Sequence, residues 1–288
     1  MKVAVITTAA GRHEHLRLQL AGLAASTRGP DEHVVVSMAD PSIADICTSS
    51  ATVLQVRKQD GRLPVAAARN AGATHALANG ADLLVFLDVD CVPDPGLLAR
   101  YETVAGQEPA ALLSGPVAYL PPPPPAGYVL ESLPRMADPH AGRPVPAPDQ
   151  MVQLDHTLFW SLSFAIRTHT WSRIGGFYAG YSGYGGEDTD FAQLAHAQGV
   201  PHLNVGGALA YHQWHPAPDP PLQHLHDIVR NGRIFRDRWG WWPMTGWLDA
   251  FARLGLVTYD DVYDEWTPVD EGAPEPTLTP FAPGNCYQ

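Results

Sequence analysis

An uninterrupted apolar run, Leu83 to Leu87, is followed directly by two acids, Asp88 and Asp90. Such a run is typical of a strand that is covered on both faces, as in the parallel sheets of α/β proteins. Side chains alternate along extended backbone, so the two carboxylates are expected to project to one side while Val89 projects to the other. The sequence therefore predicts two acids at the carboxyl end of a buried strand, the edge at which open α/β sheets bind ligands.

The pair formed by Asp88 and Asp90 has two interpretations. Two carboxylates that face one cation suit a hard divalent metal, Mg²⁺ or Mn²⁺. Aspartate is also common in turns, and the following segment, Val92 to Pro95, contains two prolines. This stretch by itself is compatible with both a metal site and a turn.

Strands and helices alternate through the first third of the chain. The apolar runs and periodicities predict strands at 3–7, 33–37, 51–56 and 83–87 and helices at 13–25 and 65–78. Alternation at these spacings is typical of an α/β fold with a mostly parallel, Rossmann-like central sheet flanked by helices. We expect residues 1–105 to form this half of the domain.

Residues 106–248 are expected to form the second half of the same domain. Their predicted elements are strands at 158–166, 202–205 and 208–211 and helices at 168–174, 188–198 and 222–238. Two proline-rich segments, 121–125 and 137–149, are expected to be loops or a cover over the site. From Asp249 on, the chain holds eight acids and one base, so residues 249–288 are predicted to be an acidic, proline-rich tail.

Charge and hydropathy disfavour several classes of function. The formal net charge is −12, which disfavours nucleic acid as a partner. No apolar run reaches the ~18 residues of a membrane span, and the apolar segment at the amino terminus is too short for a signal peptide, so we expect a cytoplasmic protein. Cys47, Cys91 and Cys286 are widely spaced and odd in number, which indicates ordinary thiols.

A second chemical motif lies at residues 175–190, where glycines and tyrosines alternate ahead of Glu187, Asp188 and Asp190. Glycine lets a ligand approach the backbone closely, and tyrosine rings bind the apolar side of a sugar ring. The helix dipole also favours acids in a first turn, which accounts for one or two of the three acids. It does not account for the array of glycines and tyrosines.

Taken together and in order, four motifs resemble those of the GT-A glycosyltransferases. They are the first strand, the segment Ala67 to Gly72 with Arg69-Asn70, the segment Phe86 to Asp90, and the segment Gly175 to Asp188. The chain is similar in particular to family 2 enzymes whose C-terminal half is of the β-1,4-galactosyltransferase and chondroitin synthase type. The resemblance covers roughly residues 2–215, implies a GT-A fold with an acceptor-binding C-terminal half, and favours the metal interpretation of Asp88 and Asp90.

The resemblance implies a role for each matching residue. Asp188 would be the general base for the acceptor hydroxyl, and Asp90 would bind the metal that bridges the donor diphosphate, with His212 as a further ligand. Asp88 would hold the ribose or a metal-bound water. The implied acceptor-binding residues are Tyr184, Gly186, Glu187 and Asp190, and the implied donor-binding residues are Thr8, Arg12, Asp40, Arg69 and Asp88.

The implied reaction is inverting transfer of a hexosyl or N-acetylhexosaminyl group from a UDP-linked nucleotide sugar to a hydroxyl of a saccharide or glycoconjugate. Mn²⁺ or Mg²⁺ would neutralise the leaving diphosphate, and a base would activate the weak nucleophile. A nucleotidyltransferase is one alternative, although no glycine-rich, lysine-containing triphosphate loop follows the first strand. A non-catalytic carbohydrate-binding protein on a transferase fold is another, although all four acids, Asp88, Asp90, Glu187 and Asp188, are present.

Two later features have less specific interpretations. His215 lies three residues after His212, and without a cysteine partner the spacing does not indicate zinc, so His215 is interpreted as a bystander in the same loop. The segment Arg230–Trp242 combines arginines with tryptophans. A solvated helix with buried tryptophans is favoured there over a phosphate contact, and a phosphate contact over a membrane contact, since the acidic tail disfavours an anionic membrane.

Overall fold

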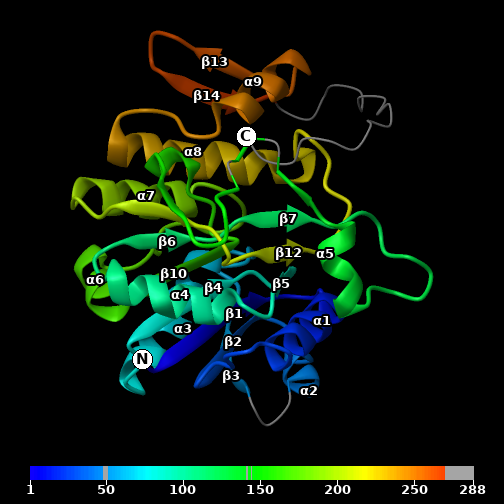
Figure 1. Ribbon diagram of the computed structural model, residues 1–288. Coiled ribbons are helices and arrows are strands. Elements are labelled where there is room, and N and C mark those ends of the chain that lie inside the picture. The colour runs from blue at the N-terminus through cyan, green and yellow to red at the C-terminus, as the bar shows by residue number, and fades with distance from the viewer. Residues whose placement is uncertain (48–50, 141, 144, 270–288) are drawn as a thin grey trace. The chain divides into compact units, whose positions relative to one another are not determined.

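The computed structural model describes residues 1–47, 51–140, 142–143 and 145–269, and the chain divides into two compact units (Figure 1). The first unit comprises residues 1–179 and 188–215, and the second comprises residues 180–187 and 216–288. Of the array of glycines and tyrosines, residues 180–187 are grouped with the C-terminal part of the chain.

An eight-stranded sheet forms the centre of the first unit, in the order β3-β2-β1-β4-β10-β6-β11-β9. Its first four strands are parallel, and β10 runs antiparallel between β4 and β6. The strands are β1 (Val3–Ala9), β2 (Glu32–Met38), β3 (Ala51–Val56), β4 (Leu83–Leu87), β6 (Leu112–Ser114), β9 (Met151–Gln153), β10 (Ser163–Arg167) and β11 (His202–Val205). The predicted α/β fold with a mostly parallel central sheet is confirmed, and β4 is buried along its whole length.

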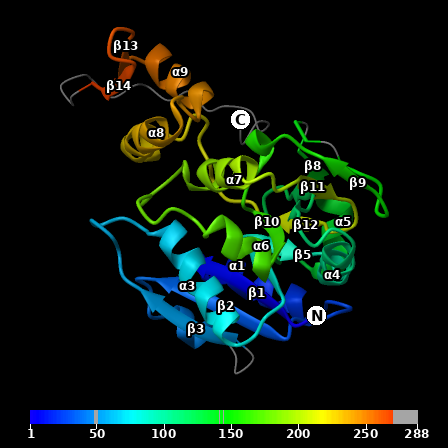
Figure 2. The same cartoon turned by 90° about the vertical axis from the view of Figure 1, so that its left-hand side faces the viewer.

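Helices cover both faces of this sheet because successive side chains of a strand point to opposite sides. On one face, Val85 packs with Leu23 and Tyr101. On the other, Gly72 lies so close to Ile6 that a Cβ at residue 72 would be 2.5 Å from its Cγ2 atom, and Figure 2 shows α3 alongside β1 and β2. The α-helices are α1 (His13–Ala24), α2 (Ile43–Ile46), α3 (Val65–Ala78), α4 (Leu97–Gln107), α5 (Leu133–Met136), α6 (Thr168–Ile174) and α7 (Glu187–Ala197), and 3-10 turns lie at Leu130–Ser132 and His156–Leu158.

A cluster of aromatic rings fixes α6 and α7 to the sheet. Phe86 of β4 stacks on Phe164 of β10, with ring centroids 4.4 Å apart. Phe177, which follows α6, stacks on Phe191 of α7 at 4.5 Å. These apolar contacts hold the start of α7 in a defined position against the sheet.

A second, four-stranded sheet in the same unit has the order β5-β12-β7-β8. Its strands are β5 (Cys91–Pro93), β7 (Val117–Tyr119), β8 (Asp138–Pro139) and β12 (Ala210–His212). In its register His212 lies opposite Cys91 on one side and opposite Tyr119 on the other. Three segments that are far apart in the sequence therefore meet next to Asp90.

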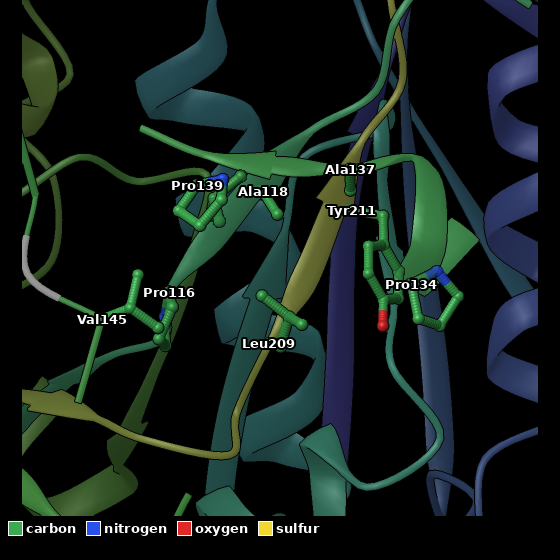
Figure 3. A pocket seen from close by; sticks show the side chains of 9 residues that line it. Pro116, Ala118, Pro134, Ala137, Pro139, Val145, Leu209 and Tyr211 are labelled. Atoms are coloured by element: carbon green, nitrogen blue, oxygen red, sulfur yellow. The ribbon is translucent and has the colours of Figure 1, made fainter. Parts of the chain in front are cut away.

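The small sheet has an apolar pocket on one face (Figure 3). Ala118, Leu209 and Tyr211 line it together with prolines such as Pro116 and Pro139. Because side chains alternate along β7 and β12, the next residue of each strand, Tyr119 or His212, points to the opposite face.

The second unit contains α8 (Leu225–Trp239), α9 (Thr245–Arg253) and a hairpin of β13 (Val257–Asp260) and β14 (Glu265–Pro268), with a 3-10 turn at Leu222–His224. Its core comprises Ile228, Trp242, Leu248, Phe251 and Trp266, together with Leu225, Val229 and Val257. Of the tryptophans predicted to be buried, Trp242 lies in this core and its indole N–H donates to Asp264 Oδ1 at 2.9 Å, whereas Trp241 is exposed.

The acidic segment that begins at Asp249 is folded as far as Val269, in contrast to the predicted tail. Phe251, Val257 and Trp266 are apolar residues within it, and they pack into the core of the second unit. The excess of acids in this segment does not prevent its apolar residues from being buried. The rest of the predicted tail, with Cys286, lies outside the described residues.

Two other predicted elements differ at their ends. The predicted strand 158–166 is β10 alone, because Asp155 Oδ1 accepts from the Thr157 amide at 2.8 Å and starts a 3-10 turn. The predicted helix 222–238 begins with a 3-10 turn before α8. None of the helices in the described ranges is both long and apolar enough to cross a membrane.

Gly72→Val should destabilise the protein, because the added atoms would overlap Ile6 and Val36, which a Cβ already approaches to 2.5 and 3.1 Å. Overpacking of this kind typically costs about 1–3 kcal/mol of unfolding free energy. Urea denaturation followed by circular dichroism measures the change. Thr74→Val, at an exposed position of the same helix, is the control and should change stability by less than about 0.5 kcal/mol; equal effects of the two changes would contradict the packing described here.

Candidate active site

The two acids after β4 lie in a tight turn that leads into β5. The chain turns at Val89 and Asp90, and the amide of Cys91 donates to the carbonyl oxygen of Asp88 at 2.8 Å. The buried side chain of Gln19 donates to the carbonyl oxygens of Asp88 and Cys91, at 2.6 and 3.0 Å. Because the backbone turns instead of staying extended, the two carboxylates have different partners.

Asp90 lies with His212 and His215 in a cluster that can hold a metal ion, since one ligand atom from each side chain lies within 4.8 Å of the others. His212 Nε2 is 3.7 Å from Asp90 Oδ1, and His215 Nε2 is 3.5 Å from Asp90 Oδ2. Asp90 Oδ1 and His212 Nε2 are buried, and neither has a hydrogen-bond partner among the residues described. Buried polar atoms are nearly always paired, so these two atoms fit a shared cation.

The protonation states of this cluster suit metal binding. Burial lowers the pKa of His212, which favours the neutral imidazole that ligates metals. Burial by itself would raise the pKa of Asp90, but the adjacent His212, His215 and Arg12 hold it well below its usual range. The cluster therefore presents an ionised carboxylate and a neutral imidazole at neutral pH.

The predicted donor-binding residues near β1 have different surroundings. Thr8 is buried near the end of β1. Arg12 Nη1 lies 3.2 Å from Asp90 Oδ2, and its backbone has a φ of 54°, in the left-handed region. Asp40 accepts a hydrogen bond from the Gly11 amide at 2.8 Å and contacts His13 and Ser42, so its carboxylate organises the loop that carries Arg12.

Asp88 belongs to a second cluster, with Arg69 and Asp188. Arg69 Nη2 donates to Asp88 Oδ1 at 2.8 Å, and the buried guanidinium lies 5.2 Å from the centroid of the Phe177 ring. Burial raises the pKa of Asp88 to about 6, against the lowering effect of Arg69, and the nearby Asp90 and Asp188 raise it further. Burial also raises the pKa of Asp188, and Arg69 again opposes the shift. One cation thus serves two carboxylates.

Asp188 and Asp190 face different surroundings although both lie at the start of α7. Asp188 Oδ1 accepts from the Thr189 amide at 2.7 Å and stays partly exposed. Asp190 has no exposed surface, so it is enclosed by protein and not available for the direct acceptor contact expected of it.

The other predicted acceptor-binding residues belong to the second unit. Tyr184 stacks on His224 with ring centroids 4.3 Å apart, and Gly186 has a φ of 90°. Asn231 of α8 donates to the carbonyl oxygens of Ser182, Tyr184 and Gly185, at 3.2, 3.1 and 2.7 Å. Asn231 therefore anchors the glycine-rich loop up to Glu187, where α7 begins. Arg230 donates to the Ser182 carbonyl and pairs with Asp227, so within this unit it binds protein groups.

Three similarities to known proteins add to this geometry. Residues 146–209 match the family model described as the N-terminal domain of galactosyltransferase. The chain is 28% identical over 226 residues to the validoxylamine A glucosyltransferase of Streptomyces hygroscopicus subsp. limoneus, a match that covers 69% of this chain and 49% of that protein. The crystal structure of S. aureus TarS, residues 1–349, is similar with a TM-score of 0.54 at 14% sequence identity, over 82% of this chain and 64% of that chain.

These similarities support a GT-A glycosyltransferase with a galactosyltransferase-like domain. The likeness to TarS concerns the fold alone, and the chain spans about half the length of the curated relative that it matches. The segment that matches the galactosyltransferase model contains Asp188 but neither Asp90 nor His212. The model match therefore covers one residue of the second cluster and none of the first.

Sequence reasoning missed two residues that the structure brings to the site. His215, interpreted from the sequence as a bystander, lies as close to Asp90 as His212 does. The spacing of the two histidines directly after a strand was the available signal. Gln19, which fixes the turn, shows no such signal, because a buried glutamine in a helix looks like any polar helical residue.

Removal of a cluster ligand should weaken metal binding. We expect His212→Ala and His215→Ala each to lower the affinity for Mn²⁺ by at least about 10- to 100-fold, the loss seen even for outer partners of metal ligands. Mn²⁺ should bind more tightly than Mg²⁺, because imidazole suits Mn²⁺ better than Mg²⁺. Electron paramagnetic resonance of free Mn²⁺ measures the Mn²⁺ affinity directly and the Mg²⁺ affinity by competition. His169→Ala, at an exposed position, is the control, and unchanged affinity in His215→Ala would assign that histidine no ligand role.

Proposed function

We propose that the protein is a metal-dependent, inverting glycosyltransferase that moves a sugar from a UDP-linked donor to an acceptor hydroxyl. The observation that carries this proposal is the division of the first unit's acids into two clusters. Asp90 lies among histidines, while Asp188 lies apart from them with a raised pKa. A transferase of this kind needs one site for the leaving group and one for the nucleophile.

The leaving-group side is assigned to Asp90, His212 and His215, which would hold Mn²⁺. When bound, the metal would supply positive charge against the diphosphate as it departs. Arg12, 3.2 Å from Asp90, places a second positive charge on this side and is proposed to contact the donor phosphates. Thr8 and the loop held by Asp40 are proposed to line the nucleotide.

The nucleophile side is assigned to Asp188. A hydroxyl is a weak nucleophile, and a carboxylate whose pKa is raised by burial is a stronger proton acceptor than an exposed one. In the proposed reaction the acceptor oxygen attacks the anomeric carbon and its proton passes to Asp188. The bond from that carbon to the phosphate oxygen breaks, and its electron pair stays on the diphosphate.

For the donor sugar and the acceptor, we propose only a chemical class. One relative is named for glucosyl transfer and the matching family model for galactosyl transfer, so we propose a hexose donor, with UDP-glucose and UDP-galactose tested first. The acceptor is proposed to be a saccharide or glycoconjugate. Tyr184, Gly186 and Glu187 are proposed to bind it, because an aromatic ring beside a glycine backbone suits the apolar side of a sugar.

Asp188→Asn should abolish most of the activity while donor binding remains. Loss of a general base typically lowers the rate by about 10²- to 10⁴-fold. The measurement is Mn²⁺-dependent release of UDP from UDP-glucose and UDP-galactose with and without saccharide acceptors. Asp45→Asn removes an exposed carboxylate and should leave the rate unchanged. Full activity in Asp188→Asn would remove that residue from the mechanism, and release of pyrophosphate from UTP would point to a nucleotidyltransferase instead.

The pH profile should report the environment of Asp188. Its protonated form cannot accept a proton, so kcat/KM should fall as pH decreases through its pKa, which burial raises above the ordinary value of 3.8. Because Arg69 lowers this pKa, Arg69→Gln should move the acidic limb of the profile to higher pH. Arg69→Lys keeps the charge and is the control. An acidic limb that stays in place in Arg69→Gln would show that another group titrates.

A further inference from the structure

Arg143 is a largely enclosed cation in the proline-rich segment 137–149 of the first unit. The centre of its guanidinium lies 3.6 Å from the centroid of the Trp160 ring, and Nη2 donates to the carbonyl oxygen of Leu158. Its buried Nε has no acceptor, and no carboxylate among the described residues lies within ion-pairing distance of it. Burial lowers the pKa of Arg143 to about 10, so the group stays charged at neutral pH.

Arg143 lies near both clusters of the proposed site. Tyr119 and Asp188 lie close enough to raise the pKa of Arg143 against the effect of burial. The Tyr119 ring packs on the ring of His212, with centroids 4.9 Å apart. His140 packs on Tyr119 at 5.7 Å and edge-on against Trp160 at 5.0 Å, so a continuous row of rings joins the support of Arg143 to the histidine cluster.

An enclosed charge without a counter-ion is costly, and a stacked aromatic ring offsets only part of that cost. Stacking on Trp160 covers a face of the guanidinium and leaves its in-plane N–H groups available to an acceptor. The guanidinium of Arg143 is therefore suited to an anion that binds at its in-plane edge. Asp88, Asp90 and Asp188 would repel any anion, but the Asp90 cluster can hold a divalent cation that would offset this repulsion for a phosphate.

We propose that Arg143 binds the terminal phosphate of the nucleoside diphosphate that leaves in the reaction, as a second cation beside the metal. This inference rests on the function proposed above. As the bond between the anomeric carbon and the phosphate oxygen breaks, negative charge moves onto that phosphate, and a guanidinium donates two N–H groups to it. Arg143 would then act on the leaving group while Asp188 takes the proton of the nucleophile.

The test compares nucleoside diphosphates with monophosphates. Isothermal titration calorimetry at saturating Mn²⁺ gives the dissociation constants of UDP and UMP, with GDP and dTDP and their monophosphates as alternatives, for the full chain and for Arg143→Gln. We expect diphosphate binding to weaken about tenfold or more, the loss typical of a charge-assisted hydrogen bond, while monophosphate binding changes less than about threefold. The same variant should lower kcat and leave the KM of the acceptor nearly unchanged.

Two further variants and the Mn²⁺ affinity control this test. Arg173→Gln removes an exposed arginine and should bind both nucleotides like the unchanged protein. Arg143→Lys keeps the charge without the planar fork and should be intermediate. Equal loss for diphosphate and monophosphate, an unchanged diphosphate affinity, or a selective rise in acceptor KM would overturn the role of Arg143. Absence of Mn²⁺-dependent diphosphate binding in the unchanged protein would instead overturn the proposed function itself, and a thermal melt identifies any variant that fails to fold.

Discussion

The pairing of β12 with β5 is the constraint on which the candidate metal site depends. β5 begins at Cys91, directly after Asp90, and the register places His212 opposite Cys91. A shift of one residue would turn the imidazole into the apolar pocket and bring Tyr211 to the site instead. The register continues past the strand, because the Gln213 amide donates to the carbonyl oxygen of Asp90 at 2.7 Å. That contact holds the chain while it brings His215 back toward the same carboxylate.

Electrostatics divides the first unit's acids between separate cations. Asp90 has Arg12 and two histidines around it, whereas Asp88 and Asp188 share Arg69. In a partly buried site, where water screens charges weakly, this difference sets the protonation states apart. Asp90 is ionised far below neutral pH, and the other two acids have raised pKa values. Neighbouring carboxylates can therefore serve different purposes without any difference in their chemistry.

The fold of the first unit was predictable because its signals are local. The buried run of β4, the alanine-rich α3 and the first strands each follow from hydrophobic pattern and propensity within one segment. The site was predictable only where a motif matched a known family. His215 depends on a turn fixed by long-range contacts, and its spacing from His212 is a weak local signal. The folded segment after Asp249 was obscured because its acids outnumber the few apolar residues that form its core.

Helical geometry explains why the three acids at the start of α7 cannot have one role. Residues two apart on a helix point about 200° apart, so Asp188 and Asp190 face opposite sides of α7. The side that faces the aromatic cluster is buried, and Asp190 lies there with no exposed surface. Counting acids in the sequence therefore overestimated the acceptor site, whereas the 3.6-residue period would have separated Asp188 from Asp190.

The same rotation of side chains around a helix explains the different contacts of the adjacent residues Arg69 and Asn70 on α3. Neighbouring side chains on a helix point about 100° apart, so one helix turn can hold two different segments. Arg69 binds Asp88 at the end of β4, while the Asn70 amide donates to the carbonyl oxygen of Phe177 at 2.7 Å and accepts from its amide at 2.9 Å. A Cβ at Gly176 would lie 2.8 Å from Asn70 Oδ1, so only glycine permits this clamp. Both segments are thereby fixed to one rigid helix, and Phe177 in turn packs on Phe191 of the helix that carries Asp188. The distance between Asp88, at the end of β4, and Asp188, at the start of α7, is therefore set by the packing of these elements. Two carboxylates that share Arg69 require such a fixed distance.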